Sequence, residues 1–195
     1  MMVTAIRRRR KIHAGLLTAT LMLWLGTTPA QADDSQHEQG RAIVRDFGMQ
    51  LQTALKVALE EGGPAAAIRV CKEIAPQIAS ELSRQNGVKV QRTSLRVRNP
   101  ANLAEPWQVE VLNAFEDAAD DDAELELEHF EAGDAGQPAR YAKAIRTGAM
   151  CLVCHGAAVS VDVVKLLDSE YPFDRARGYE LGDIRGAFSV TWPVN

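Results

Sequence analysis

The chain has 195 residues, enough for one domain with a hydrophobic core, and its 46% hydrophobic and 25% charged residues are typical of a globular protein. Its formal net charge is −4, but residues 1–32 hold five basic residues and no acidic one, which leaves 17 basic and 26 acidic residues and a net charge of −9 after them. Such an acidic body lacks the basic surface that neutralises phosphates, which argues against nucleic acid as a partner.

Residues 1–32 have the layout of a secretory signal peptide. A basic segment, 7–11, precedes a short apolar run, 14–25, and Ala30-Gln31-Ala32 is an A-x-A cleavage site. The run is shorter than the roughly 20 residues that span a bilayer. We therefore expect export to the periplasm, with 33–195 as a single domain that keeps no membrane span; an uncleaved N-terminal anchor is the alternative.

Two consecutive helices, 35–61 and 64–85, are predicted to form an antiparallel pair. Ser35 and Glu38 make a capping box, S-x-x-E, at the start of the first helix. Apolar residues then recur at helical spacing, and Gly62-Gly63 followed by Pro64 separates the two helices.

Cys71 lies on the apolar stripe of the second predicted helix. Pro76 follows it and cannot donate a hydrogen bond to the Lys72 carbonyl, so we expect a kink near Cys71. From the helix pattern, Cys71 is either a small buried core residue or a residue with a function.

The rest of the chain is predicted to alternate strands and short helices. A strand over 88–97 changes phase near Arg92, which indicates a bulge. The remaining predicted elements are a helix over 106–119, strands over 125–131 and 140–147, a helix over 161–169 and a last strand over 187–192.

Residues 116–131 contain nine acidic residues and no Lys or Arg. A solvated turn with an exposed edge strand explains such a run. Calcium binding is an alternative, although the EF-hand spacing is missing. A third reading is a docking face for a basic redox partner.

The segment Cys151-Leu152-Val153-Cys154-His155 is a C-x-x-C-H motif, the pattern that attaches a c-type haem. The thiols of Cys151 and Cys154 would bond to the porphyrin, and the imidazole of His155 would be the proximal iron ligand. A dithiol redox motif, a zinc site and a Cys151–Cys154 disulfide are the competing interpretations. Haem c also fits an exported chain, because the haem-maturation machinery of bacteria acts outside the cytoplasmic membrane.

A second axial ligand is needed if the iron is six-coordinate. The candidates are Met49, Cys71, His37, His129 and Met150. No Met follows residue 150, so the layout of an ordinary soluble cytochrome c, with a downstream Met ligand, does not apply.

The chain resembles a family of exported PAS-like haem c domains, long catalogued as a domain of unknown function. The matching segments are 69–76, 92–102, 151–156, 171–174, 178–179, 182–183 and 185–190. The resemblance implies an α+β fold, with a PAS-like antiparallel sheet flanked by helices. It also implies Cys/His axial ligation, with Cys71 as the distal ligand. The acidic segment 116–131 is not part of the matching pattern.

A thiolate ligand is anionic and favours Fe(III), so we expect a low reduction potential. Loss of that ligand on reduction would suit redox or small-ligand sensing, or slow electron transfer. An ordinary electron carrier is the alternative, and a haem enzyme is disfavoured because no distal acid–base constellation is evident. Arg98 and Arg185 are hypothetical partners for the haem propionates, or else turn arginines at the surface.

Overall fold

The computed structural model describes residues 29–121, 125–134 and 136–194. Most of the expected signal peptide, 1–28, lies outside them, and 29–32 form the first turn of a helix. Within the described ranges, no helix combines the length and the apolar character needed to cross a membrane.

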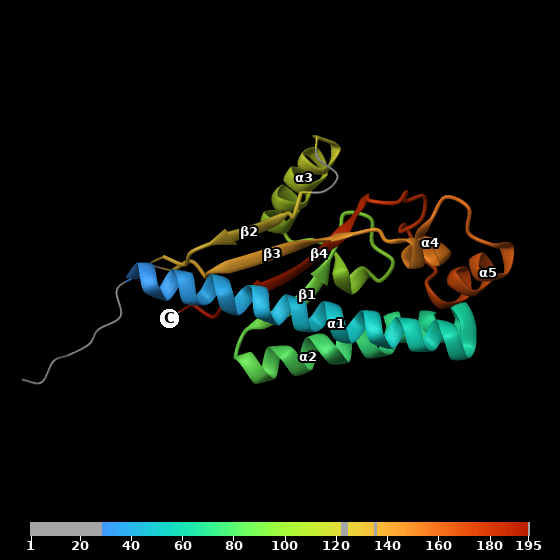
Figure 1. Ribbon diagram of the computed structural model, residues 1–195, viewed down its shortest axis with the longest axis horizontal. Coiled ribbons are helices and arrows are strands. Elements are labelled where there is room, and N and C mark those ends of the chain that lie inside the picture. The colour runs from blue at the N-terminus through green and yellow to red at the C-terminus, as the bar shows by residue number, and fades with distance from the viewer. Residues whose placement is uncertain (1–28, 122–124, 135, 195) are drawn as a thin grey trace, which may run out of the picture.

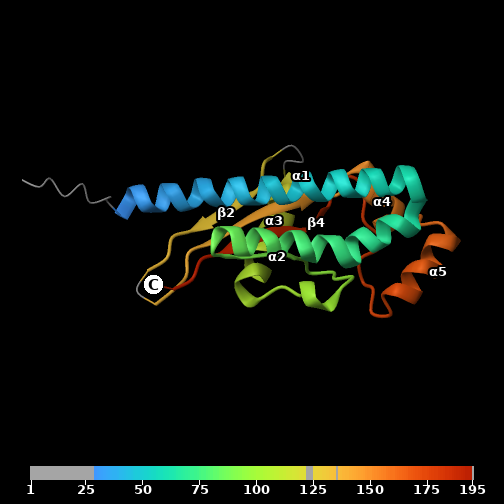
Figure 2. The same ribbon diagram turned by 90° about the horizontal axis from the view of Figure 1, so that it is seen from below.

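The predicted helical pair is present (Figures 1 and 2). The first helix, α1 (Pro29–Arg69), bends at Gly63, whose φ of 62° and ψ of −160° lie outside helical values. Glycine adopts a positive φ without the steric cost that a side chain would add. The chain therefore reverses where the Gly-Gly-Pro sequence predicted the break. The start was predicted wrongly: the helix already begins at Pro29, so Ser35 lies inside it and does not cap it.

Between α1 and α2 (Ala75–Asn86) lies a π-helical turn, η1 (Val70–Ile74). The Ala75 N–H donates to the Val70 carbonyl, five residues back rather than four. Pro76 has no N–H to offer the Lys72 carbonyl and its ring crowds that carbonyl, so a widened turn relieves both problems. An irregularity was expected near Cys71 as a kink, and the structure has it as a π turn.

Four strands form one antiparallel sheet in the order β1-β4-β3-β2. Their bounds are β1 (Lys89–Thr93), β2 (Glu128–Glu131), β3 (Arg140–Arg146) and β4 (Ile184–Thr191). The last strand in sequence, β4, lies between β1 and β3, and Lys89 pairs with Thr191. The strands alternate their side chains between two covered faces.

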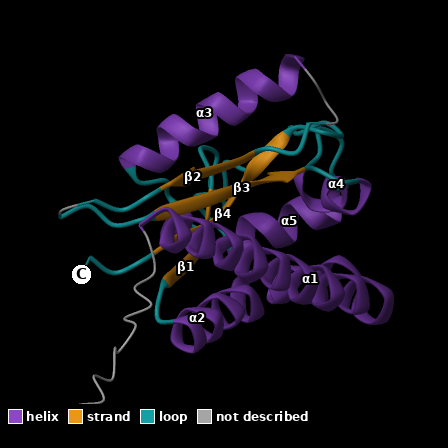
Figure 3. Cartoon of the chain, turned by 60° about the vertical axis from the view of Figure 1, so that its left-hand side comes forward, coloured by secondary structure: helices purple, strands orange, loops and turns teal. Residues whose placement is uncertain are grey.

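Helices cover both faces of the sheet (Figure 3). On one face the α1/α2 pair packs against Tyr141 and Val190. On the other, α3 (Pro106–Asp121) packs against Ala142 and Ala187. This layered arrangement confirms the α+β, PAS-like fold.

The sheet differs from the prediction at one end. The strand expected over 88–97 leaves the sheet after Thr93, and the bulge expected near Arg92 lies instead on the neighbouring strand. There Ile145 pairs with Gly186 and Arg146 pairs with Ile184, which leaves Arg185 as the extra residue. A Cβ on residue 186 would lie 2.2 Å from the Thr93 carbonyl oxygen, so only glycine allows the strands to approach this closely.

Three short helices lie near this end. They are η2 (Pro100–Asn102), a 3₁₀ turn, and the two helices α4 (Ala149–His155) and α5 (Val161–Glu170). The C-x-x-C-H motif occupies α4, a helix that the sequence reading did not predict.

Candidate haem site

One cavity of about 370 Å³ brings together the two cysteines of the C-x-x-C-H motif, its histidine and Cys71. Cys151, Cys154 and His155 line it from α4, and Cys71 lines it from η1. Apolar side chains complete much of the wall: Leu51, Leu55, Leu59, Ile68, Val97, Ile145 and Phe188. Two segments 80 residues apart in sequence therefore meet at a single, largely apolar pocket.

The motif is presented by a short helix. Because Cys151 and Cys154 are three residues apart, both thiols face the same side of α4. The helix stops at His155, and the Gly156 N–H donates to the Leu152 carbonyl at 3.0 Å. A Cβ on residue 156 would lie 2.8 Å from that carbonyl oxygen, so a glycine is needed directly after the histidine.

The His155 ring is oriented by a backbone carbonyl. Its Nδ1 lies 2.7 Å from the Ala176 carbonyl oxygen, which can only accept, so Nδ1 carries the hydrogen. Nε2 then keeps its lone pair, and its protein neighbour is Arg98 Nη1 at 3.4 Å. Desolvation lowers the pKa of His155 well below its usual value, and the charges of Arg185 and Arg98 add to this effect. A neutral imidazole with Nε2 available is the form that binds a metal.

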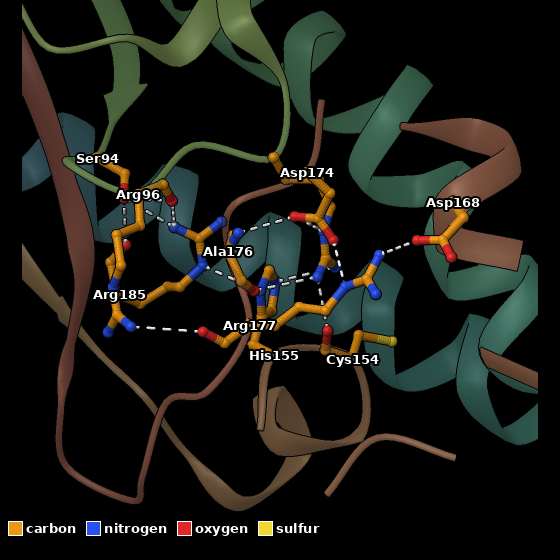
Figure 4. Close-up of polar contacts among 10 residues, drawn as sticks. Ser94, Arg96, Cys154, His155, Asp168, Asp174, Ala176, Arg177 and Arg185 are labelled. Carbon is orange, nitrogen blue, oxygen red and sulfur yellow. Dashed lines mark hydrogen bonds and ion pairs between the residues drawn. The ribbon is translucent and has the colours of Figure 1, made fainter. Parts of the chain in front are cut away.

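A buried carboxylate holds the segment that carries this carbonyl (Figure 4). Asp174, whose side chain is 1% exposed, pairs with Arg98 Nε at 3.1 Å and accepts from Arg177 Nε at 2.8 Å. It also accepts from the Ala176 N–H at 2.8 Å. Arg98 in turn donates to the carbonyls of Cys154, at 2.6 Å, and Ala176, at 3.2 Å. The network ties the loop after α5 to the end of α4 and so fixes the acceptor of His155.

Arg98, for which the sequence left open a haem propionate or a surface turn, instead forms part of this buried network. Its 7% exposed side chain is occupied by Asp174 and by backbone carbonyls. Asp174 itself fell inside a matching segment, but nothing in the local pattern showed that it would pair with an arginine 76 residues away.

Of the other candidate axial ligands, one lines the cavity and three lie outside it. Met150 lines the cavity together with the ligands named above. Met49 is 56% exposed and lines a separate groove between α1 and α2. His37 stacks on Phe130 with 4.8 Å between ring centroids, and His129 lies on β2; neither lines the cavity.

The acidic segment 116–131 forms the end of α3, the approach to β2, and β2 itself, with 122–124 outside the described residues. Three of its acids pair with basic residues of this chain: Glu126 with Lys143, Glu128 with Arg41, and Glu131 with Arg140. Within the described parts of the chain no group of three or more His, Cys, Asp or Glu residues is placed to hold a metal ion.

The charge of the cavity fits haem, which carries two carboxylates on an apolar ring. Its lining residues, all of them in the described part of the chain, include Arg92, Arg98, Arg146 and Arg185 but no Asp or Glu. This is unusual for a chain of net charge −4. An apolar pocket with two thiols, a neutral imidazole and a cationic lining matches the group that the motif predicts.

A family model described as Tll0287-like matches residues 26–193. The chain belongs to the Tll0287-like family. Its fold is also similar to the crystal structure of the cyanobacterial haem protein Tll0287, with a TM-score of 0.57 and 28% sequence identity. That similarity covers 77% of this chain and 92% of the other. A comparison with curated proteins found no match.

Membership of the Tll0287-like family confirms the family-level resemblance seen in the sequence, since the match covers nearly all of the described chain. The segments that carried the resemblance also meet in space. Segments 69–76, 92–102, 151–156 and 185–190 all contribute lining residues to the one cavity, and 171–174 contributes Tyr171 to the lining and Asp174 to its brace.

Proposed function

We propose that this Tll0287-like chain is a periplasmic c-type haem protein of low reduction potential that senses redox state or a small ligand, or transfers electrons slowly. Cys151 and Cys154 would hold the haem covalently, with His155 and Cys71 as the iron ligands. The observation that carries the proposal is the single cavity that all four residues line.

When bound, haem supplies a one-electron Fe(III)/Fe(II) couple. The residues of the chain would supply the iron ligands and set the reduction potential of this couple. His155 offers a neutral Nε2, with its tautomer held by the Ala176 carbonyl. Cys71 would supply a thiolate, whose negative charge would favour the ferric state and lower the potential. The apolar walls keep water from the site and strengthen these charge effects.

Sensing is favoured over fast electron carriage by the way Cys71 is held. It sits on a π-helical turn, a local irregularity common at functional sites. If Cys71 is an iron ligand, one-electron reduction by a donor would weaken the preference for a thiolate, and a Cys71 thiolate that takes up a proton would no longer bind the iron. A carrier instead benefits from two ligands that stay in place.

The localisation part of the proposal rests on the basic segment, the apolar run and the A-x-A site within 1–32. Covalent attachment would require the haem-maturation machinery as a partner, and a basic redox partner could dock on the acidic segment 116–131.

The first test is the mass of the mature chain made together with haem-maturation machinery. We expect a haem-sized increment on the wild type and none on the Cys151→Ala/Cys154→Ala variant, because the thioether bonds need both sulfurs. A wild-type chain without the increment would remove the proposal.

The second test concerns the distal ligand. Cys71→Ala should keep the haem mass but change the oxidised electronic and EPR spectra, whereas Met150→Leu, a change in the same cavity, should leave them as they are. Unchanged spectra in Cys71→Ala would show that the thiolate is not a ligand. Binding of carbon monoxide or nitric oxide by the reduced protein is expected of a sensor that frees a site, and its absence would favour the electron-transfer role.

A further inference from the structure

The four arginines of the cavity differ in what balances their charge. Arg98 is paired with the buried Asp174. Arg146 donates to two backbone carbonyls, those of Gly182 at 3.2 Å and Leu125 at 3.0 Å. Arg92 and Arg185 remain, and neither forms an ion pair with an acidic residue in the described parts of the chain.

Arg185 is directed toward the cavity by the bulge in β4, where it is the extra residue. Among the described residues its guanidinium donates to two neutral groups, the Ser94 hydroxyl at 3.0 Å and the Arg96 carbonyl at 3.4 Å, and its Nε lies 3.2 Å from His155 Nδ1. A half-buried cation that lines a cavity with other cations is stabilised by an anion nearby.

Arg92, at the end of β1, makes fewer hydrogen bonds to the described residues than Arg185 does. Its Nη2 makes one long contact, 3.5 Å, to the Cys71 carbonyl oxygen. Five guanidinium N–H groups are available to it, so most of its hydrogen-bonding capacity is left for a ligand. Like Arg185, it lines the cavity.

The neighbouring Thr93 adds a third, independent observation. Its side chain is 3% exposed and lines the same cavity, yet its hydroxyl has no hydrogen-bond partner among the described residues. Leaving a buried hydroxyl unpartnered is costly, so such a group indicates a partner that the polypeptide does not supply.

We propose that Arg92, Arg185 and the Thr93 hydroxyl form a carboxylate-binding subsite that holds the two haem propionates. Haem carries two propionates, and guanidinium binds carboxylate through paired hydrogen bonds. The subsite rests on the proposed function, because it assigns residues to a haem that the C-x-x-C-H motif would attach. It also separates the roles of Arg98 and Arg185, which the sequence suggested together as propionate partners.

The test uses the haem-loaded full chain and the propionate bending bands of its resonance Raman spectrum. Arg92→Gln and Arg185→Gln should each shift these bands and lower the reduction potential, because a positive charge beside a carboxylate is lost. Arg96→Gln is the matched control: its guanidinium lies 3.7 Å from the Tyr179 ring centroid and does not line the cavity, so its bands should be those of the wild type.

If an arginine variant does not fold, Thr93→Val provides a second test of the subsite. It replaces a hydroxyl without a protein partner by a methyl group of similar size, so the apoprotein should fold as before, and a smaller shift of the same bands is expected. Arg185→Lys, which keeps the charge, should recover part of the wild-type potential.

Two results would overturn the subsite. One is wild-type bands in haem-loaded Arg92→Gln, Arg185→Gln and Thr93→Val alike. The other is a wild-type spectrum and potential that depend on added inorganic phosphate, which would show that a free anion occupies the guanidiniums. Both leave the proposed function intact, whereas absence of the haem-sized mass from the wild type would remove that function and the subsite together.

Discussion

His155 reaches the cavity from a helix whose end is tied down, whereas Cys71 reaches it from a π-helical turn. On the His155 side, the Tyr179 N–H donates to the His155 carbonyl and the Gly178 N–H to the Gly156 carbonyl. Asp174, Arg98 and the Ala176 peptide brace the same loop. On the Cys71 side, the segment carrying the thiol departs from regular helix geometry because of Pro76. The difference shows that the two proposed iron ligands are held in different ways, His155 by a network of hydrogen bonds and an ion pair, and Cys71 by an irregular helical turn.

The largest expected effect on stability comes from the network on the His155 side of the cavity. Asp174→Asn removes the charge that balances Arg98 and should lower the free energy of unfolding by about 3 kcal/mol, as when one partner of a buried pair is lost. It should also change the EPR signature of His155 ligation, since the Ala176 carbonyl is no longer held. Chemical denaturation and EPR of the haem-loaded protein measure the two effects.

Asp168→Asn is the matched control for this change. Asp168 bonds to the same Arg177, but its side chain is 63% exposed, so its loss should cost no more than about 0.5 kcal/mol. Equal effects of the two substitutions would contradict the special role of the buried carboxylate.

Low pH should weaken the network of Asp174 on the His155 side of the cavity. Burial acts to raise the pKa of Asp174, but the Ala176 N–H and the guanidiniums of Arg98 and Arg177 outweigh it and hold that pKa below its usual value. The folded chain therefore binds this proton less readily than the unfolded chain. The stability that Asp174 contributes is complete above about pH 4 and is lost as the pH falls toward the folded-state pKa.

Unfolding measured from pH 6 downward should show this loss in the wild type and a smaller one in Asp174→Asn. Parallel pH curves for the two proteins would refute the assignment.

A change on the other side should alter spectra more than stability. Pro76→Ala restores an N–H that can donate to the Lys72 carbonyl, which favours a regular helix over the π turn and shifts the position of Cys71. We expect changed Cys71-dependent absorption and EPR features, an unchanged haem mass, and a stability within about 1 kcal/mol of the wild type.

Pro64→Ala is the control, because Pro64 directly follows the Gly63 break, where a helix tolerates proline. Wild-type spectra for Pro76→Ala would mean that the π turn does not position the thiol.

The smallest effect concerns a link between the two sides. Lys72, on the π turn, pairs with Glu170, at the end of α5, at 2.6 Å, with side chains 45% and 42% exposed. Exposed pairs contribute little, so Lys72→Gln should cost about 0.5 kcal/mol or less, and high salt should remove most of the difference. A loss above about 2 kcal/mol would show that the two sides depend on each other more than the structure indicates.

The parts of this molecule that could be predicted are those with local signals. Ile43, Phe47 and Leu51 recur at helical spacing and are buried, and the Gly62-Gly63-Pro64 break falls where the chain reverses. Pro76 predicted a distortion beside Cys71 because the chemistry of proline acts within one turn. The C-x-x-C-H motif is also a local signal, because five consecutive residues carry the prediction of haem attachment.

The parts that could not be predicted depend on distant or backbone groups. The acceptor of His155 is the carbonyl of Ala176, an atom that every residue has and that leaves no mark in the sequence. The bulge was expected near Arg92 but falls at Arg185, because the phase of a strand shows an irregularity in the pairing and not which partner contains it. Arg98 and Arg185 look alike in sequence, and only the position of Asp174 separates their roles.

The position of β4 has a consequence for how the molecule assembles. β4 follows every other strand in the sequence but pairs with both β1 and β3, and its pairing with β1 joins residues about a hundred positions apart. Contacts between such distant segments form slowly, because a long loop must close first. The same strand supplies Arg185, Gly186 and Phe188 to the cavity wall. Until β4 pairs with β1 and β3, the chain therefore has neither a complete sheet nor a complete pocket, and we expect the two to form together.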